Sequence, residues 1–386
     1  MQKKQFCNRK ENIMDQLHEN FAWLHTHPEL SYQEVETTRF IRAQLAQAGV
    51  DILPYPLETG LVAQVTGARP GPVVALRADI DALPVTEESG LAYASCTPGK
   101  MHACGHDFHT AVLLEVSRRL QKNAARLTGT VRLIFQPGEE RSDGALKILA
   151  TPAMQDVQAV FALHAAPWFP VGTMGVRVGA ASASVDRFEI TVRGKGCHAA
   201  APEKGVDPIV AAAAIVSAVQ TEVSRNVSPV NPALVSITHL EAGNTWNVIP
   251  ETAYMEGTVR THAPADRESI PRRLQAIAES VAAAYGAEAE FSWHPGPPAT
   301  DNDPEWTAFS AQVGRDTGLV VEEDPANMLG EDFSWFQQKA RGVYIHMGVG
   351  LTKPLHNPAF IVDPDALAPA ARYFAALAEK ALVRLA

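Results

Sequence analysis

The order of helix-like and strand-like segments changes in the middle of the chain, and this change constrains the fold more than any other feature. Over residues 1–181, segments with apolar residues at helical spacing, such as 34–49 and 109–124, alternate with apolar strand-like runs, such as 71–84 and 129–140. Such alternation is typical of a mostly parallel sheet covered by helices. The chain therefore predicts an α/β fold class.

Residues 182–294 follow a different order, strand-helix-strand-strand-helix-strand. The expected elements are 184–196, 207–225, 233–243, 252–262, 267–286 and 287–296. This order is that of the ferredoxin-like unit. The α/β pattern then resumes and closes with a helix. We therefore expect a discontinuous α/β domain at 1–181 and 295–386, interrupted by a small inserted domain at 182–294.

Charge and hydropathy exclude several classes of partner. The net charge of -10 lacks the basic excess of a nucleic-acid-binding surface. The apolar run 209–219 is about half a membrane span and rich in alanine, so it predicts a packed helix. The N-terminal residues lack an export signal's apolar region, and we expect a solvated tail with Met14 as an alternative start to Met1. Four scattered cysteines are too few for a disulfide framework: Cys7, Cys96, Cys104 and Cys197. A cytoplasmic protein is predicted.

Four apolar strands end in, or lead toward, side chains that can bind a metal or act as acids. These side chains are Asp79 and Asp81, Glu139 and Glu140, His164, and His356. In open α/β sheets the ligand crevice lies beyond the carboxyl ends of the strands, so these residues can converge there. The motif MHACGHDFHT at 101–110 precedes a helix that would leave the same rim.

Cys104 and His106 in that motif allow two chemical interpretations. They could be the nucleophile and base of a cysteine protease. That interpretation gives no role to Glu139, Glu140 or His164, and we expect the motif ahead of the helix rather than at its first turn. A metal site uses all of these residues, and thiolate and imidazole ligands suit zinc or another late divalent metal. Taken alone, the pair would more commonly be a buried thiol and a hydrogen-bonded histidine.

The adjacent Glu139 and Glu140 would, in isolation, be the polar start of a helix. Beside soft ligands, one can bind a metal while the other stays free as a base for an activated water. In the inserted block, His198, Asn247 and Arg260 become donors for a substrate carboxylate or an oxyanion if this domain folds over the crevice.

Together, these motifs resemble the dinuclear metallopeptidase superfamily of aminoacylases and bacterial carboxypeptidases. They are most similar to its amidohydrolase branch, which contains hippurate hydrolases and auxin–amino acid conjugate hydrolases. The motifs are RADIDALP, MHACGHDFHT, FQPGEE, CHAAAPEKGVDPI, NVIPE, GEDFSWF and LHNPAF, and they cover nearly the whole chain after residue 14.

The resemblance implies two divalent metal ions, zinc first, with manganese, nickel or cobalt as alternatives. The implied ligands are Cys104, His106, Glu140, His164 and His356. Cys104 stands where relatives outside this branch have a bridging aspartate. Asp79 stands where those relatives have a ligand histidine, so it has no metal role here.

The resemblance also implies roles for the other site residues. Glu139 matches the general acid/base. Asp81 matches an aspartate that does not bind the metal itself but contacts a metal ligand and orients it. His198, Asn247 and Arg260 match lid residues that orient the substrate carbonyl and carboxylate. In this superfamily such residues can come from a partner subunit, so we expect a homodimer, or a tetramer, assembled through the lid.

The sequence departs from the family pattern in two places, and the second of them concerns the substrate side. Gly138 replaces an alanine before the glutamate pair, which we expect to be harmless. Ala201 and Glu203 replace a methionine and a histidine, and Trp246 precedes Asn247. A tryptophan near the pocket would suit an aromatic or indolic acyl group.

These features predict a metal-dependent amidohydrolase. It would cleave N-acyl-L-amino acids (hippurate-like, N-acetyl or aryl-acetyl) into a carboxylate and a free amino acid. A dipeptidase or carboxypeptidase on the same two-metal site is an alternative within the enzyme class. A non-catalytic metal-binding homologue is an alternative of another class, but such a protein would have no use for Glu139.

Overall fold

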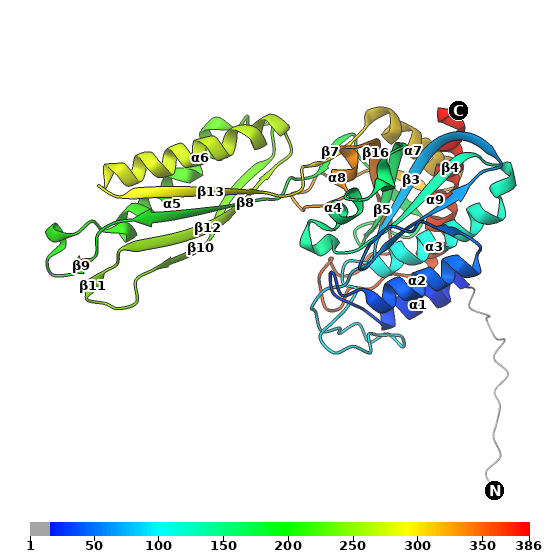
Figure 1. Cartoon of the computed structure of the whole chain (residues 1–386), viewed down its shortest axis with the longest axis horizontal. Helices are drawn as coiled ribbons and strands as arrows, with labels where there is room; N and C mark the ends of the chain where they lie inside the picture. Colours follow the sequence, from blue (N-terminus) through cyan, green and yellow to red (C-terminus); the bar gives the residue numbers. More distant parts are fainter. Residues whose placement is uncertain (1–15) are drawn as a thin grey trace, which may run out of the picture.

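The computed structural model describes residues 16–386 and separates them into an α/β body and an elongated lid (Figure 1). Cys7, the predicted solvated tail and the alternative start at Met14 lie outside the described residues. The segments 183–185 and 296–299 join the two parts, and we keep the predicted boundaries 1–181, 182–294 and 295–386 as a proposal.

The body is built on an eight-stranded sheet, which confirms the predicted α/β class. Its order is β1 (Asp51–Ile52), β2 (Leu61–Thr66), β4 (Thr128–Gln136), β3 (Arg69–Asp79), β5 (Val157–Ala166), β16 (Arg341–Gly348), β6 (Thr173–Val176) and β15 (Val320–Glu323). The four central strands, β4, β3, β5 and β16, are parallel to their neighbours in this set. Antiparallel pairs occur toward the edges of the sheet. A separate short pair, β7 (Gly179–Ser182) and β14 (Thr300–Asn302), lies where the chain leaves and re-enters the body.

Helices cover both faces of this sheet. The helices of the body are α1 (Gln16–Thr26), α2 (Val35–Gln47), α3 (His106–Lys122), α4 (Gly144–Leu149), α7 (Pro304–Asp316), α8 (Ser334–Gln337) and α9 (Leu367–Leu385). In β5, Phe161 and Leu163 pack into the larger core with residues of α3 and α9, while Val160 and Ala162 pack into a smaller core with α4 and α8. Because side chains alternate along a strand, His164 continues the smaller-core face.

The lid is the predicted ferredoxin-like unit. Its elements are β8 (Asp186–Arg193), α5 (Pro208–Asn226), β10 (Ala233–Ala242), β12 (Thr252–Thr261), α6 (Pro264–Ala284) and β13 (Glu288–Pro295). The antiparallel sheet has the order β10-β12-β8-β13. Alternate residues of β8, such as Phe188 and Ile190, pack with apolar residues of both helices into a separate core. A two-stranded pair, β9 (Cys197–His198) and β11 (Val248–Ile249), forms the end of the lid farthest from the body (Figure 1).

Two local expectations were wrong. The apolar spacing of residues 143–154 predicts a single helix, but α4 ends at Leu149 and a 3-10 turn follows at Pro152–Met154. Pro152 disfavours helical backbone at Thr151, which is extended. The motif 101–110 is not wholly ahead of its helix either, because α3 begins at His106 directly after Gly105, whose φ is 83°. Within residues 16–386, no helix has the length and apolar character needed to cross a membrane.

Candidate metal centre

A cavity of about 320 Å³ lies at the carboxyl ends of the central strands, where the body meets the base of the lid. Its lining includes Cys104, Glu139, Glu140, His164 and His356 from the body. Arg260 of β12 reaches the same cavity from the lid. Residues far apart in the sequence therefore meet at one site.

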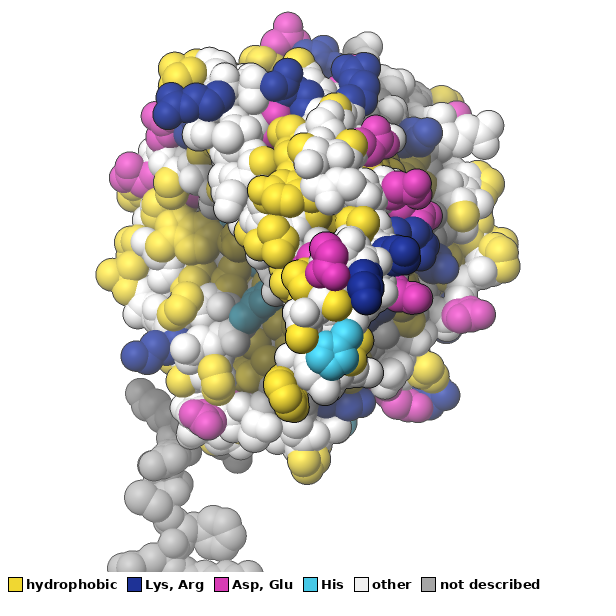
Figure 2. Space-filling view, turned by 90° about the vertical axis from the view of Figure 1, so that its left-hand side faces the viewer, with side chains coloured by type: hydrophobic (Ala, Val, Ile, Leu, Met, Phe, Trp, Pro, Cys, Tyr) yellow, Lys and Arg dark blue, Asp and Glu magenta, His cyan; other side chains and the backbone are white. Residues whose placement is uncertain are grey.

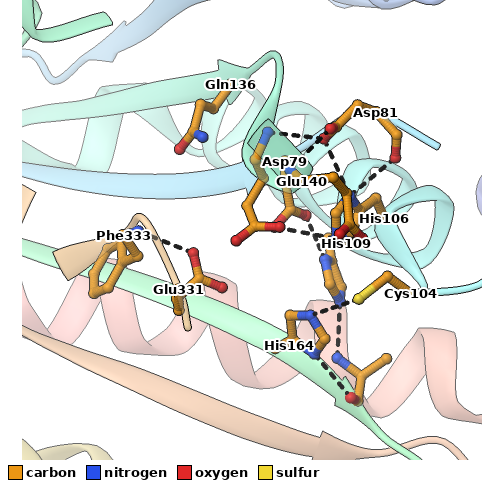
Figure 3. Close-up of polar contacts among 12 residues, drawn as sticks. Asp79, Asp81, Cys104, His106, His109, Gln136, Glu140, His164, Glu331 and Phe333 are labelled. Carbon is orange, nitrogen blue, oxygen red and sulfur yellow. Dashed lines mark hydrogen bonds and ion pairs between the residues drawn. The ribbon is translucent and has the colours of Figure 1, made fainter. Parts of the chain in front are cut away.

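The five predicted ligands lie together in overlapping groups. Within each group the potential ligand atoms lie within 4.8 Å of one another. Three of these groups are Cys104 with His106 and His164, Cys104 with Glu140 and His356, and Glu140 with His106 and Glu139. A further group joins His106 to Asp79 and His109. Figure 3 shows Cys104 pointing toward His164, with a separation of 3.5 Å between Sγ and Nε2. Cys104, His106 and Glu140 each belong to two of the first three groups, so the groups join into one cluster.

Unpartnered buried atoms point to cations at this site. His106 Nε2 and Glu140 Oε1 are both buried without a hydrogen-bond partner among the described residues. His106 Nδ1 lies 2.9 Å from the Asp81 carbonyl oxygen, which fixes the ring and leaves Nε2 directed to the cluster. Buried polar atoms are rarely left unpaired, so these two atoms fit a metal.

Electrostatics support the same conclusion. Burial raises the pKa of the Cys104 thiol well above its ordinary value, and Glu140 and Glu139 raise it further. Burial alone would lower the pKa of His106, but Asp79 and Asp81 raise it to about 10. The site therefore requires added positive charge, and a divalent ion would supply it while displacing the protons of these ligands. A thiol with a raised pKa is also a poor nucleophile, which counts against the cysteine protease interpretation.

Glu139 is buried and its charge is opposed by its surroundings. Burial raises the pKa of Glu139 well above its ordinary value, and the carboxylates of Glu331, Glu140 and Asp332 raise it further, against the effect of Arg77. Such a carboxyl group can hold a proton in the site, and nearby cations would lower its pKa and favour the ionised form that accepts a proton.

Asp81 holds the glutamate pair and a ligand in place. Its two carboxylate oxygens accept hydrogen bonds from the backbone N–H groups of Glu139 and Glu140, each at 3.1 Å. Oδ1 also lies 3.3 Å from His106 Nδ1 (Figure 3), and Ser31 Oγ donates to Oδ2 at 2.7 Å. Asp81 thus orients both a ligand and the candidate base.

Gly138 has a structural requirement that the sequence did not indicate. Its φ is 65°, and a Cβ atom there would lie 2.5 Å from Cε1 of Tyr32. The expectation that this departure from the family pattern is harmless therefore needs refinement: the glycine fits beside Tyr32, and an alanine would not.

Replacing Gly138 by alanine is expected to destabilise the protein and lower its activity. The left-handed backbone costs about 1–2 kcal/mol for a residue with a Cβ, and overpacking against Tyr32 adds about 1–3 kcal/mol. Gly90→Ala is the matched control, because Gly90 has a φ of 72° and no heavy atom lies within 4 Å of the position that its Cβ would take. Urea unfolding of both variants would test this, and equal losses of stability would rule out the Tyr32 contact.

A buried ion network behind the cavity was not predicted. Its centre is Arg77, which is fully buried and lies 2.5 Å from Asp79, 2.9 Å from Glu331 and 2.9 Å from Asp332. Arg77 also donates to Gln136 at 2.8 Å. The motifs RADIDALP, FQPGEE and GEDFSWF contained these residues, but nothing in the sequence indicated that they meet.

The remaining polar residues of the 101–110 motif lie behind the cluster. His109 Nδ1 lies 2.5 Å from Asp79 Oδ1, and its Nε2 accepts from the backbone N–H of Ala165 (Figure 3). Asp107 Oδ2 lies 2.6 Å from Nδ1 of the buried His25. His102 is buried, and neither of its ring nitrogens has a hydrogen-bond partner among the described residues.

The predicted lid residues fall in two places. Arg260 is half-buried at the cavity, and no side chain within residues 16–386 forms an ion pair or hydrogen bond with it. His198, Asn247 and Trp246 instead lie at the far end of the lid around β9 and β11, away from this chain's own cavity (Figure 1). Trp246 is 92% exposed. Figure 2 views the molecule from this end and shows apolar side chains spread over its surface.

Comparisons with known proteins identify the family of the chain. The sequence model of the peptidase family M20/M25/M40 matches residues 75–380. The chain is 48% identical over 356 residues to an N-acetylcysteine deacetylase of Bacillus subtilis (92% of this chain, 94% of the relative). It is 38% identical over 367 residues to thermostable carboxypeptidase 1 of Saccharolobus solfataricus (92% and 93%). A solved Bacillus subtilis structure, described as a dinuclear metal binding peptidase from the M20 family, matches with a TM-score of 0.87 and 44% identity, covering 95% of this chain and 98% of that one. The chain therefore belongs to the peptidase family M20/M25/M40 and is a hydrolase that acts on amide bonds.

Proposed function

We propose that the protein is a two-metal amidohydrolase that cleaves N-acyl-L-amino acids into a carboxylate and a free amino acid. The observation that carries this proposal is that one cavity contains two kinds of group: a buried carboxylate beside the ligand cluster, and an arginine without an ion-pair partner within residues 16–386. Glu139 provides the acid/base group and Arg260 provides a receptor for a carboxylate. The names of the relatives support hydrolysis of acylated amino acids or peptides.

Five residues would hold the two ions: Cys104, His106, Glu140, His164 and His356. Zinc is the metal we propose first, because thiolate and imidazole ligands favour it, with manganese, nickel and cobalt as alternatives. When bound, the ions supply Lewis-acid polarisation of the amide carbonyl and lower the pKa of the attacking water.

Glu139 moves the proton in this proposal. Its carboxylate accepts a proton as water attacks the carbonyl carbon, and it returns the proton to the leaving nitrogen as the amide bond breaks. Asp81 keeps this carboxylate in place through the backbone N–H of Glu139. Burial in the cavity limits competition from bulk water.

Arg260 would bind the α-carboxylate of the amino acid. Its guanidinium forms no ion pair with an acid within residues 16–386, and it can form two parallel hydrogen bonds to a carboxylate. We further propose that a second copy supplies His198 and Asn247 from its lid, because the same residues of this chain lie away from its own cavity. This assembly would be a homodimer or a tetramer, located in the cytoplasm.

The proposal is tested by amine release from a panel of substrates. Ninhydrin detection would follow hydrolysis of N-acetyl, hippuryl and indole-acetyl amino acids, with unblocked dipeptides in the same panel. We expect release from N-acyl amino acids, its loss on chelation and its recovery on adding zinc. Hydrolysis of dipeptides alone would favour the carboxypeptidase alternative, which the Saccharolobus relative supports. No hydrolysis by the metal-loaded protein would contradict the proposal.

Replacing Cys104 by alanine is expected to remove metal, because its thiolate would be a ligand in the proposed two-metal site. We expect metal content to fall from two ions per chain toward one or none, measured by inductively coupled plasma mass spectrometry after gel filtration. Cys197→Ala, at a half-buried cysteine of the lid, is the matched control and should keep both ions. Full metal content and activity in Cys104→Ala would exclude this ligand.

A further inference from the structure

One histidine of the cavity has no role in the proposed ligand set. His346 lies on β16 and lines the cavity beside Trp168 and Tyr344. It is absent from the ligand groups found among residues 16–386. Its position in β16 is paired with that of His164 in the parallel strand β5, so both side chains rise from the same face of the sheet. The two ring centroids are 6.0 Å apart.

A buried acid fixes the orientation of this ring. His346 Nδ1 lies 2.5 Å from Oδ2 of Asp324, and the two side chains are 6% and 2% exposed. Asp324 follows β15, and its backbone N–H donates to Val176. Its carboxylate packs over Gly175, where a Cβ would lie 3.0 Å from Oδ1. The backbone of β15 and β6 therefore holds Asp324 in the position from which it contacts His346.

The other ring nitrogen is left to the cavity. No hydrogen bond to His346 Nε2 occurs within the described part of the chain, and this atom lies across the ring from the one tied to Asp324. The His346 ring packs in T-shaped contacts with two aromatic side chains, at centroid distances of 4.9 Å to Trp168 and 5.1 Å to Tyr344. Nε1 of Trp168 is also buried without a partner among residues 16–386. The subsite thus combines aromatic walls with two unused polar atoms.

The direction of the substrate follows from the proposed function. With the α-carboxylate at Arg260 on the lid and the scissile carbonyl at the ligand cluster, the acyl substituent is the part of the substrate left to occupy the body side of the cavity. His346 lies there, one strand beyond His164.

We propose that His346, oriented by Asp324, is a specificity-determining residue that selects short acyl groups carrying a hydrogen-bonding substituent next to the carbonyl, such as a hydroxyl. This inference rests on the proposed function. A buried polar group that is built to bond a substrate group discriminates against analogues that lack it, because the protein group is then left unpaired.

The test compares two acyl groups of nearly equal size on the same amino acid. N-glycolyl-methionine carries a hydroxyl where N-propionyl-methionine carries a methyl group. We expect kcat/KM of the wild-type enzyme to favour the glycolyl substrate about five- to tenfold, as one net hydrogen bond allows. The ratio is measured on one preparation, so it does not depend on the fraction of folded or metal-loaded enzyme.

Three variants connect the ratio to this residue. His346→Phe with Asp324→Leu removes both members of the pair and leaves no unpaired buried charge, and its ratio should fall to about one. His346→Gln retains a hydrogen-bonding group and should keep part of the preference. Asp324→Asn should give an intermediate ratio, because the ring is less firmly oriented.

The outcomes separate this inference from the proposed function. Hydrolysis of both substrates by the wild type at equal kcat/KM would overturn the selection by His346 and leave the amidohydrolase assignment standing. A preference that persists unchanged in the double variant would also overturn it. No hydrolysis of either substrate, or of N-acetyl-methionine, would contradict the proposed function itself.

Discussion

Glu139→Gln is expected to lower kcat by about 10²–10⁴-fold while both metal ions stay bound, because positioned acid/base groups contribute effects of that size. Glutamine has nearly the same shape as glutamate and would keep the packing of this buried side chain. It cannot take the proton of the attacking water or return it to the leaving nitrogen. The measurements are steady-state kinetics on an N-acyl amino acid and metal content on the same sample.

Glu140→Gln is the matched control for this prediction. The two glutamates are adjacent, the backbone N–H of each donates to Asp81, and only Glu140 is assigned as a ligand. Glu140→Gln should therefore lose metal, whereas Glu139→Gln should not. Loss of metal in both variants, or near wild-type turnover in Glu139→Gln, would show that the division of roles is wrong.

Arg77→Met is expected to cost about 3–5 kcal/mol in the free energy of unfolding, since breaking a buried ion pair leaves uncompensated charge. Three carboxylates depend on this guanidinium: those of Asp79, Glu331 and Asp332. Methionine fills much of the same volume, so the loss would come from charge rather than from a cavity. Urea unfolding monitored by circular dichroism, on metal-loaded protein, measures it.

The control replaces an arginine whose ion pairs lie on the surface. Arg187 of the lid contacts Glu189 and Glu256, and its side chain is 54% exposed. Arg187→Met should change stability little, because exposed pairs are weakened by solvent. If Arg77→Met were as well tolerated as Arg187→Met, the buried network would not be a stabilising element of the body.

The architecture was predictable because it depends on local patterns. Apolar runs such as 71–84 indicate strands buried on both faces, and the order of elements in 182–294 indicates the ferredoxin-like unit. The rule that ligands gather at the carboxyl ends of parallel strands is enough, with the sequence alone, to bring Glu140 and His164 to one site.

The parts that were missed depend on contacts between distant segments. Arg77 and Glu331 meet across 254 positions of the chain, and no periodicity in either segment encodes that pairing. His346 lies inside an apolar strand, and a histidine in such a strand is most simply interpreted as a packed core residue. Only its contact with Asp324, which the sequence does not reveal, indicates a polar role. The distance of His198 from its own cavity depends on how the lid is held by two connecting segments, which local sequence does not determine.

The alternation of side chains along the central strands has a consequence for how this protein can diverge. Arg77, His164 and His346 occupy one face of strands whose other face builds the larger core. An insertion or deletion of one residue in these strands would exchange the two faces. The polar residues of the site would then point into the core, and the core residues would point into the cavity. New substrate ranges are therefore accessible mainly through single substitutions at wall positions, or through length changes in the loops and the lid. The residue register of the central strands must therefore stay fixed for the reaction, whereas the length of the surrounding segments can change.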